Sequence, residues 1–463
     1  MLKVALINPT QFTRYSQPPL GLALIAAVLE REGYQVTVLE ANALKLQPED
    51  IIPLVSADVI GLTAMTPTIN TAIAIARHLK KAYPDLPIIL GGVHVTLLPE
   101  ETLVTAPEID ILVRGEGEET IIEVLRALEH KQPLSKISGI SYRKNGEVVS
   151  NPARTKNVDL DSLPFPAYHL LPWRSYKPHP PHGRALPFAA IITSRGCPYK
   201  CSYCSKPVFG SEFRAQTPER VVGEVAYYKR RFGIKEFAFY DDVFTLDKER
   251  ASAIADGMIK KGLKIHWTCE TRVNLVDKEL LRRMKQAGCY SVAYGIESGS
   301  QEILNTLDKD ISLEQVEEAI RLSREVDLQT IGYFMIGSPG ESPETVRQTI
   351  QFAKKLKLDF AQFAVTTPFP GTKLYNLYLD GRKNDNIPWG SFVYAGSGGD
   401  MAPVFESSLL NKDDIQYWTR RAYREFYLRP SHLWQQIRQT TSIRDLKVNI
   451  KGLLMLLGNI RPM

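Results

Sequence analysis

Short apolar runs alternate with amphipathic stretches over the first 130 residues of the chain. The apolar runs have the length of buried strands and occupy residues 3–8, 35–39, 59–63, 87–90 and 109–113. Between them, apolar positions recur at helical spacing, at residues 20–32, 68–81 and 118–130. Strands that alternate with helices are typical of a parallel sheet, so this region is predicted to be an α/β domain of the Rossmann or flavodoxin type.

Small and polar residues follow the predicted strands of this first domain. Ligands of open parallel sheets bind at the carboxyl ends of the strands, where the sequence places a group of candidate binding residues. These candidates are Thr63, Thr66, Gly91, Gly92, His94 and Glu116. No G-x-G-x-x-G motif follows the first strand, so a dinucleotide site is not indicated. Two interpretations stay open: a ligand site at this edge, or ordinary turn glycines with a loop histidine.

A linker separates the first domain from a second series of strands and helices. Residues 138–151 have the pattern of a hairpin around Asn145-Gly146, and prolines are frequent from 152 to 187. Six strands are then predicted at 188–194, 235–240, 265–271, 291–296, 330–336 and 360–366, with helices at 217–231, 248–261, 278–287, 313–326 and 343–356. As in complete β/α barrels, we expect the site of this region at the carboxyl ends of its strands.

The last part of the chain, residues 376–463, is predicted to be mostly helical. Helical runs at 412–427 and 430–439 carry arginines that alternate with aromatic residues. In one interpretation an aromatic face packs on the preceding domain and the basic face is solvated. In the other, the basic residues and the apolar run 453–457 attract anionic lipid or an anionic substrate, so that this part contacts a membrane peripherally.

Length and composition limit the possible classes of protein. A chain of 463 residues exceeds one ordinary core and fits about three domains. The net charge of +6 is spread along the chain, so no nucleic-acid partner is expected. We find neither a signal-peptide pattern nor an apolar stretch of membrane-spanning length. With only five cysteines, a disulfide framework is excluded, and we expect a cytoplasmic protein.

Three of the five cysteines lie within eight residues, at Cys197, Cys201 and Cys204. Thiolates are soft ligands, suited to zinc or to iron–sulfur clusters. A closed zinc site takes four ligands, commonly in two pairs, and this sequence has no second pair. Three cysteines on one loop suit three irons of a [4Fe–4S] cluster, which leaves the fourth iron open. A zinc site completed by a histidine is the alternative.

The C-x3-C-x2-C spacing, with Tyr203 before the last cysteine, resembles the radical S-adenosylmethionine (SAM) enzymes. The resemblance implies that Cys197, Cys201 and Cys204 form the catalytic centre and bind a [4Fe–4S] cluster whose open iron chelates SAM. In that family one electron cleaves SAM to a 5′-deoxyadenosyl radical, which abstracts hydrogen from a substrate. It also implies a partial (β/α)6 barrel of the TIM type and an electron donor of the flavodoxin or ferredoxin type.

By the same resemblance, residues at the carboxyl ends of the barrel strands surround SAM. Asp241 or Asp242 would meet the methionyl amino group, and Arg272 would meet the carboxylate. The ribose would lie near Glu297 and Ser298, and the adenine beside the strand around Ile336. The implied SAM-binding residues are Tyr203, Asp241, Asp242, Glu270, Arg272, Glu297, Ser298, Ile336 and Gly337.

The first domain resembles the cobalamin-binding domain of the B12-dependent radical enzymes. Residues 18–22, 91–96 and 115–118 carry this resemblance. It implies that cobalamin is bound at the sheet edge described above. The D-x-H-x-x-G signature, which supplies an axial histidine in many cobalamin proteins, is absent after the first strand.

The two resemblances together imply a radical SAM methyltransferase that transfers a methyl group to an unactivated carbon of a small-molecule or lipid-like substrate. The cofactors would supply the chemistry, and the protein would align them and exclude water. A radical cyclase or rearrangement enzyme of the same architecture is one alternative, and a non-catalytic cobalamin or redox sensor is another. The expected domains are a cobalamin-binding domain at 1–135, a linker at 136–186, the barrel at 187–375 and a helical part at 376–463.

Overall fold

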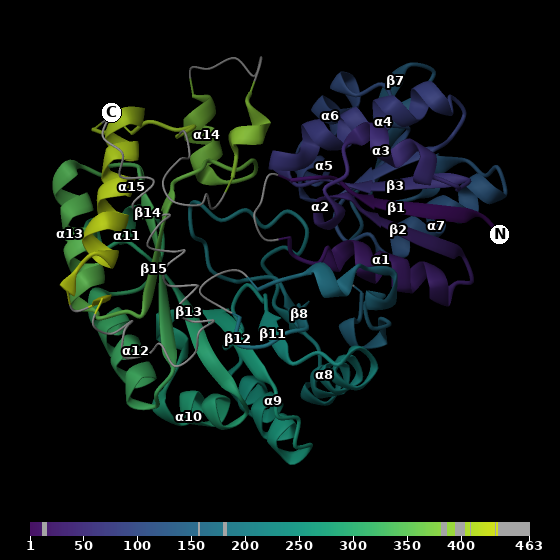
Figure 1. Cartoon of the computed structure of the whole chain (residues 1–463). Coiled ribbons are helices and arrows are strands. Elements are labelled where there is room, and N and C mark those ends of the chain that lie inside the picture. The colour runs from purple at the N-terminus through teal and green to yellow at the C-terminus, as the bar shows by residue number, and fades with distance from the viewer. Residues whose placement is uncertain are drawn as a thin grey trace.

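The computed structural model describes residues 1–11, 16–155, 158–178, 183–380, 387–393, 403–407, 409–430 and 432–433. Figure 1 shows two α/β units side by side, with the first unit at the right and the second at the left. The predicted fold class is confirmed. Residues 434–439 of the second predicted C-terminal helix and the apolar run 453–457 lie outside the described residues.

The first unit contains a seven-stranded sheet in the order β2-β1-β3-β4-β5-β6-β7. Its strands are β1 (Lys3–Asn8), β2 (Gln35–Glu40), β3 (Val59–Thr63), β4 (Ile88–Gly91), β5 (Ile111–Val113), β6 (Ile140–Lys144) and β7 (Glu147–Ser150). The first five strands pair in parallel, whereas β6 pairs antiparallel with β5 and β7. The hairpin that the sequence placed in the linker therefore extends the first sheet.

Helices cover both faces of this sheet. They are α1 (Leu20–Arg31), α2 (Ala41–Leu44), α3 (Pro48–Ile51), α4 (Ile69–Ala82), α5 (Val93–Leu97), α6 (Pro99–Thr105) and α7 (Glu118–Glu129). Apolar residues of α1 and α7 pack on one face of the sheet, and those of α4 pack on the other. The second face also receives aromatic residues of the C-terminal part, including Tyr375 of α14 (Lys373–Leu379) and Trp389.

The proline-rich linker connects the two units through a few specific contacts. It contains 3-10 turns, one of them at Tyr168–Leu170. The Ala167 amide donates to the carbonyl oxygen of Ala23 in α1, at 2.9 Å. The buried Tyr168 hydroxyl donates to the carbonyl oxygen of Ala190 in the second unit, at 2.8 Å. Two adjacent linker residues thus connect the units: Ala167 binds the first unit and Tyr168 binds the second.

The second unit contains six parallel strands in the order β15-β14-β13-β12-β11-β8. They are β8 (Phe188–Ile191), β11 (Glu236–Phe239), β12 (His266–Thr271), β13 (Cys289–Glu297), β14 (Gln329–Ile336) and β15 (Phe360–Val365). The first strand is shorter than predicted. Ser194 and Arg195 instead form β9 (Ser194–Arg195), which pairs antiparallel with β10 (Arg214–Ala215).

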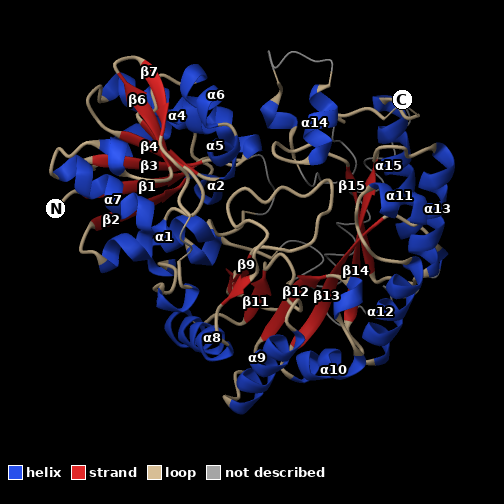
Figure 2. Cartoon of the chain, turned by 180° about the vertical axis from the view of Figure 1, so that it is seen from behind, coloured by secondary structure: helices blue, strands red, loops and turns tan. Residues whose placement is uncertain are grey.

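Helices form the outer layer of this partial barrel. They are α8 (Pro218–Phe232), α9 (Lys248–Lys260), α10 (Lys278–Gln286), α11 (Gln301–Thr306), α12 (Leu313–Glu325) and α13 (Pro343–Lys355). Local sequence explains where several begin: Thr217, Ser312 and Ser342 each accept a hydrogen bond from a backbone amide of the first turn. Figure 2 shows the loops and turns that lie between this sheet and the first one.

The last described helix, α15 (Lys412–Tyr427), packs on the barrel. Its buried side chains include Ile415, Trp418 and Phe426, which belong to the barrel's hydrophobic core. This arrangement agrees with the first interpretation of the C-terminal part, an aromatic face that packs on the preceding domain. No helix in the described part of the chain is both long and apolar enough to cross a membrane.

Candidate active site

A cavity of about 430 Å³ lies where the carboxyl ends of the two sheets meet. The first unit contributes the ends of β3 and β4 and the start of α7, and the second contributes residues 204–210 and Asp242. The apolar part of its lining comes mainly from the first unit and includes Leu6, Leu22, Ile25, Ile89 and Val113. A glycine is required at Gly92, because φ is +105° and a Cβ atom there would lie 2.6 Å from the Ala64 carbonyl oxygen.

The predicted edge residues of the first unit fall into two groups. Thr63, Gly91, Gly92 and Glu116 line the cavity. Thr66 and His94 are buried beside each other instead, with 3.4 Å between the His94 Nδ1 and the Thr66 Oγ1. The His94 ring packs edge-on against Trp389, and burial lowers its pKa to about 4. His94 is therefore neutral at pH 7 and packs between the first unit and Trp389 of the C-terminal part.

The loop that carries the three cysteines is closed at its base by the pairing of β9 with β10. It begins at Gly196, where φ is +83° and a Cβ atom would lie 2.0 Å from the Glu212 carbonyl oxygen. The Lys206 ammonium donates to the Cys197 carbonyl oxygen at 2.7 Å, across the loop. The Ser202 amide donates to the Leu307 carbonyl oxygen at 2.9 Å, which fixes the loop to the barrel.

The three loop cysteines are free thiols. Burial raises the pKa of Cys197 and raises that of Cys204 to about 11, and the neighbouring thiolates add to both shifts. Among the described residues, no three cysteine, histidine or acidic side chains converge on one metal ion. A cubane cluster binds each cysteine to a different iron, so three cysteines on one loop suit a cluster without such convergence.

The two predicted aspartates at the end of β11 have different surroundings. Asp241 is buried and accepts hydrogen bonds from the Thr193 amide and hydroxyl, both at 2.5 Å, and from the Ser194 hydroxyl at 2.9 Å. Asp241 thus fixes the backbone that leads into the cysteine loop. Asp242 lines the cavity, and burial together with Asp241 raises its pKa. Of the two carboxylates, only Asp242 lines the cavity.

Arg272, at the end of β12, is directed at the cysteine loop. Its guanidinium lies 3.6 Å from the centre of the Tyr199 ring, and Nη1 lies 3.7 Å from the Cys201 sulfur. Its Nη2 donates to the carbonyl oxygens of Lys309 and Asp310, the latter at 3.2 Å. In this structure these donors are occupied by protein atoms, whereas the sequence placed Arg272 at the SAM carboxylate.

Tyr203 and Glu297 meet in a buried trio with Lys309. The Lys309 ammonium donates to the Glu297 carboxylate at 2.8 Å and to the Tyr203 hydroxyl at 2.9 Å. The Tyr203 hydroxyl in turn donates to Glu297 at 2.9 Å. The neighbouring Ser298 hydroxyl is buried 3.0 Å from that of Thr349 in α13, so it faces the outer layer.

The remaining predicted residues lie at the ends of β12 and β14. Glu270 accepts a hydrogen bond from the Tyr333 hydroxyl at 3.1 Å, and burial raises its pKa. Ile336 is fully buried. The Gly337 amide donates to the buried Glu341 carboxylate at 2.6 Å, and a Cβ atom at Gly337 would lie 2.9 Å from the Ile415 side chain.

Comparison with known families matches both units. The model of the radical SAM superfamily matches residues 191–353, and the model of the B12 binding domain matches residues 13–125. Along nearly its whole length, the chain is 37% identical to the uncharacterized methyltransferase PH0819 of Pyrococcus horikoshii, covering 94% of this chain and 93% of that protein. The chain belongs to the radical SAM superfamily. Within it, this radical SAM enzyme carries an N-terminal B12 binding domain.

Two further proteins are similar to this radical SAM enzyme along most of its length. It is 29% identical to the anaerobic magnesium-protoporphyrin IX monomethyl ester cyclase of Cereibacter sphaeroides, over 89% of this chain and 68% of that protein. Its fold matches the cobalamin-dependent SAM radical enzyme OxsB with a TM-score of 0.75 and 18% identity, over 97% of this chain and 70% of OxsB. The arrangement of the two units is therefore one that a solved cobalamin-dependent enzyme also has.

The described residues fit the cofactors of this family. The cysteine loop offers three free thiols, the ligand type that iron–sulfur clusters require. Asp242 lines the cavity beside that loop and brings a carboxylate to it. The glycine-rich edge at Gly91 and Gly92 lets a ligand approach the backbone of the first sheet.

Some contributors to the site were not predicted from the sequence. Glu118, Arg195 and Lys206 all line the cavity, and Lys309 completes the buried trio. The sequence offered one indication that Arg195 belongs to the site, because it lies two residues before the first cysteine of the motif. Glu118 also had a signal, because it belongs to the segment 115–118 that carries the resemblance to cobalamin-binding domains. Lys206 and Lys309 lie in loops, where a charged side chain is ordinary, and only the fold brings them to the site.

Proposed function

We propose that this protein is a cobalamin-dependent radical SAM methyltransferase that methylates an unactivated carbon. The observation that carries the proposal is the shared cavity: one wall is the sheet edge of the B12 binding domain, and the other is the cysteine loop from Cys204 to Gly210. Ligands on the two units would therefore lie in one enclosed space. Enclosure and alignment are what the protein contributes when cofactors supply the chemistry.

Each residue group has a proposed role in this enzyme. Cys197, Cys201 and Cys204 would hold the [4Fe–4S] cluster, and Asp242 would bind the amino group of SAM. When bound, these groups supply a 5′-deoxyadenosyl radical and cobalamin supplies the methyl group. Arg272 directs positive charge at the Cys201 sulfur, which favours an electron-rich cluster. The edge at Thr63, Gly91 and Gly92 would receive cobalamin.

The identity of the substrate is limited by the same cavity. Its lining is mainly apolar, with charged groups gathered at the end near the cysteine loop. We propose a small-molecule or lipid-like substrate. We further propose a flavodoxin or ferredoxin as electron donor and the cytoplasm as the compartment, because free thiols persist in a reducing environment.

Anaerobic reconstitution tests the proposal. The protein is loaded with iron, sulfide and hydroxocobalamin, reduced, and given SAM with a labelled methyl group. We expect 5′-deoxyadenosine in the wild type and none in Cys201→Ala. We also expect labelled methyl groups in the protein-bound corrinoid fraction. A wild type that releases no 5′-deoxyadenosine, with its cluster intact, would refute the proposed radical chemistry.

A radical cyclase of the same architecture is the second candidate, favoured by the 29% identity to the magnesium-protoporphyrin cyclase. Both candidates predict 5′-deoxyadenosine. Only the methyltransferase predicts transfer of label from SAM to the corrinoid fraction and then to a product. Release of 5′-deoxyadenosine without any labelled corrinoid would favour the cyclase.

A further inference from the structure

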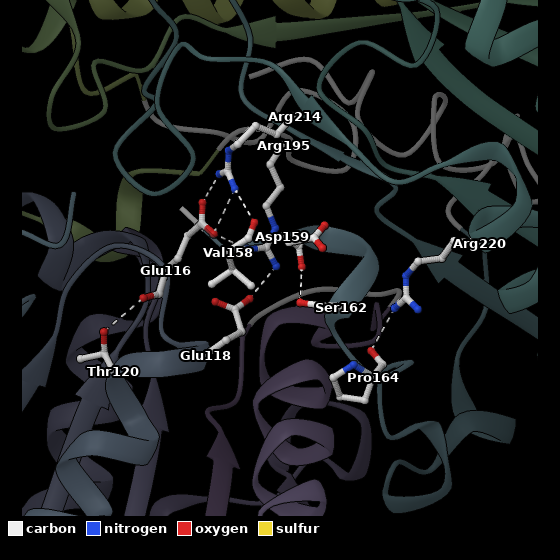
Figure 3. Close-up of polar contacts among 10 residues, drawn as sticks. All are labelled: Glu116, Glu118, Thr120, Val158, Asp159, Ser162, Pro164, Arg195, Arg214 and Arg220. Atoms are coloured by element: carbon white, nitrogen blue, oxygen red, sulfur yellow. Dashed lines mark hydrogen bonds and ion pairs between the residues drawn. The ribbon is translucent and has the colours of Figure 1, made fainter. Parts of the chain in front are cut away.

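Four buried, charged side chains connect the two units beside the cavity (Figure 3). Arg195 donates from Nη1 to Glu116 at 2.6 Å and from Nη2 to Glu118 at 2.5 Å. Arg214 donates to the other oxygen of Glu116. We call Glu116, Glu118, Arg195 and Arg214 the interdomain clamp. Its two glutamates and two arginines give the clamp a net charge of zero when all four side chains are ionised.

The position of the clamp links it to both cofactor sites. Glu116 and Glu118 precede or begin α7 and line the cavity on the side of the B12 binding domain. Arg195 and Arg214 are register partners in β9 and β10, so they hold the two ends of the cysteine loop. The Arg195 guanidinium also lies 5.0 Å from the ring centre of Phe209, which belongs to the loop wall of the cavity.

Burial makes the clamp sensitive to the position of each wall. The four side chains are between 7% and 15% exposed. A buried ion pair is stable only while its geometry and its partner groups are kept, because a separated charge stays desolvated. A shift of α7 relative to the cysteine loop would therefore break the ion pairs of the clamp. When one wall of the cavity is ordered, the clamp stabilises the other wall in its matching position.

Two buried atoms of the clamp lack a hydrogen-bond partner among the described residues, and the Arg214 Nε is one of them. The Glu118 Oε2 is buried and has no hydrogen-bond partner in the described part of the chain, although its companion oxygen is bound to Arg195. Buried carboxylate oxygens are normally satisfied. Glu118 lines the cavity, and a corrinoid has amide side chains around its rim that can donate a hydrogen bond. Glu118 therefore brings an unsatisfied acceptor to the lining of the cavity, and a donor on a cavity ligand would satisfy it.

We propose that Glu118 accepts an amide hydrogen bond from bound corrinoid, and that Arg195 couples this contact to the cysteine loop. This inference rests on the proposed function for the presence of a corrinoid. Cluster assembly orders the loop that forms one wall of the cavity, and corrinoid binding fixes the other wall. Each cofactor then binds more tightly when the other is present. Because coupling between sites is reciprocal, both directions have the same factor.

The test measures this factor with the full-length protein. Hydroxocobalamin is titrated into cluster-free protein and into reconstituted protein under anaerobic conditions, and its dissociation constant is taken from equilibrium dialysis. In the wild type we expect binding about tenfold tighter with the cluster. The reverse experiment measures the iron chelator concentration that removes half of the cluster, with and without hydroxocobalamin. It is expected to give a similar factor.

Variants assign the coupling to the clamp. Glu118→Gln removes the charge of the carboxylate that pairs with Arg195 through only one of its oxygens. The matched control is Glu119→Gln at the adjacent position of α7, where Glu119 pairs with Arg154 of the linker. Arg195→Lys keeps the charge but cannot bridge two carboxylates. Its control is Arg220→Lys, because Arg220 donates to the Pro164 carbonyl oxygen and belongs to no part of the clamp. We expect the coupling factor to fall toward one in Glu118→Gln and Arg195→Lys, and to stay near ten in both controls. Thermal unfolding of all four variants identifies any variant that is misfolded.

Other outcomes separate the failure of this inference from the failure of the proposed function. If the wild type binds hydroxocobalamin equally well with and without the cluster, the coupling does not exist. If Glu118→Gln and Arg195→Lys both keep the tenfold factor, the clamp does not carry it. If the wild type binds no hydroxocobalamin in either state, the corrinoid part of the proposed function fails.

Discussion

At the scale of single residues, the charged groups near the cysteine loop are held by specific partners. Arg272 donates to two carbonyl oxygens and reaches the Cys201 sulfur. Lys309 bridges Glu297 and Tyr203. The sequence could suggest Arg272, Glu297 and Tyr203 as site residues, because they lie at strand ends or in the motif. It could not predict which atoms they contact, since their partners are distant in the chain and meet only in the folded barrel.

The buried trio gives the first prediction at this scale. Lys309→Met leaves the Glu297 carboxylate buried without its cation, because both side chains are at most 7% exposed. We expect a loss of about 3–5 kcal/mol in the free energy of unfolding. The control is Lys278→Met, which removes an exposed ion pair with Glu325 and should cost at most about 1 kcal/mol. Urea unfolding of the anaerobic protein measures both, and equal effects would contradict the structural role of Lys309.

The second prediction concerns the buried Glu40 at the end of β2. Burial raises its pKa to about 7, although the Asn8 amide and the Ala43 backbone amide donate to its carboxylate. The folded protein therefore binds this proton more tightly than the unfolded chain does. Stability is lost as the pH rises from about 4.5 to about 7, by up to roughly 3 kcal/mol.

Glu40→Gln isolates this contribution, because glutamine does not ionise. We expect the difference in unfolding free energy between the variant and the wild type to shift in favour of the variant between pH 5 and pH 8. Urea unfolding at several pH values measures this difference. A difference that is independent of pH would show that Glu40 titrates alike in the folded and unfolded states.

At the scale of elements, the predicted strands are the part of the fold that the sequence specified best. Buried parallel strands are continuous apolar runs, and helices with capping residues such as Ser312 and Ser342 separate them. The short helices α5, α6 and α11 were not predicted, because helices of five to seven residues carry too little periodicity. The β6–β7 hairpin was recognised, but its pairing with β5 depends on a tertiary contact that local sequence does not encode.

The cysteine loop gives a prediction at this scale. Both Gly196 and Gly210 have positive φ, of +83° and +70°, so an alanine at either costs about 1–2 kcal/mol of backbone strain. Only at Gly196 would the added Cβ meet a backbone oxygen, 2.0 Å away, whereas nothing lies within 4 Å at Gly210. We expect Gly196→Ala to lose most of its iron and sulfide after reconstitution, and Gly210→Ala to keep them. Equal iron content in the two variants would contradict the close contact with Glu212.

At the scale of the whole molecule, the C-terminal part holds the two units together. Trp389 and Tyr375 belong to the hydrophobic core on one face of the first sheet, although they follow the barrel in the sequence. Trp418 of α15 belongs to the barrel core instead. The sequence indicated packing of this part on the barrel but gave no signal for its contact with the first unit. We therefore expect this contact to help set the separation of the two sheets, and with it the shape of the cavity.

Two tryptophan substitutions test this dependence. Trp389→Ala and Trp418→Ala each remove a buried aromatic side chain, so each should lower the unfolding free energy by about 3–5 kcal/mol. Trp389 contacts His94 and the first unit, whereas Trp418 lies between α15 and the barrel. Only Trp389→Ala should therefore change the position of the first unit. We expect its affinity for hydroxocobalamin to fall about tenfold, equivalent to about 1.4 kcal/mol, while that of Trp418→Ala stays within twofold.

Equal losses of affinity in the two variants would mean that general destabilisation, and not the contact between the units, determines binding. Because neither tryptophan lines the cavity, a selective loss in Trp389→Ala would show that the C-terminal part maintains the site by holding its two walls in place.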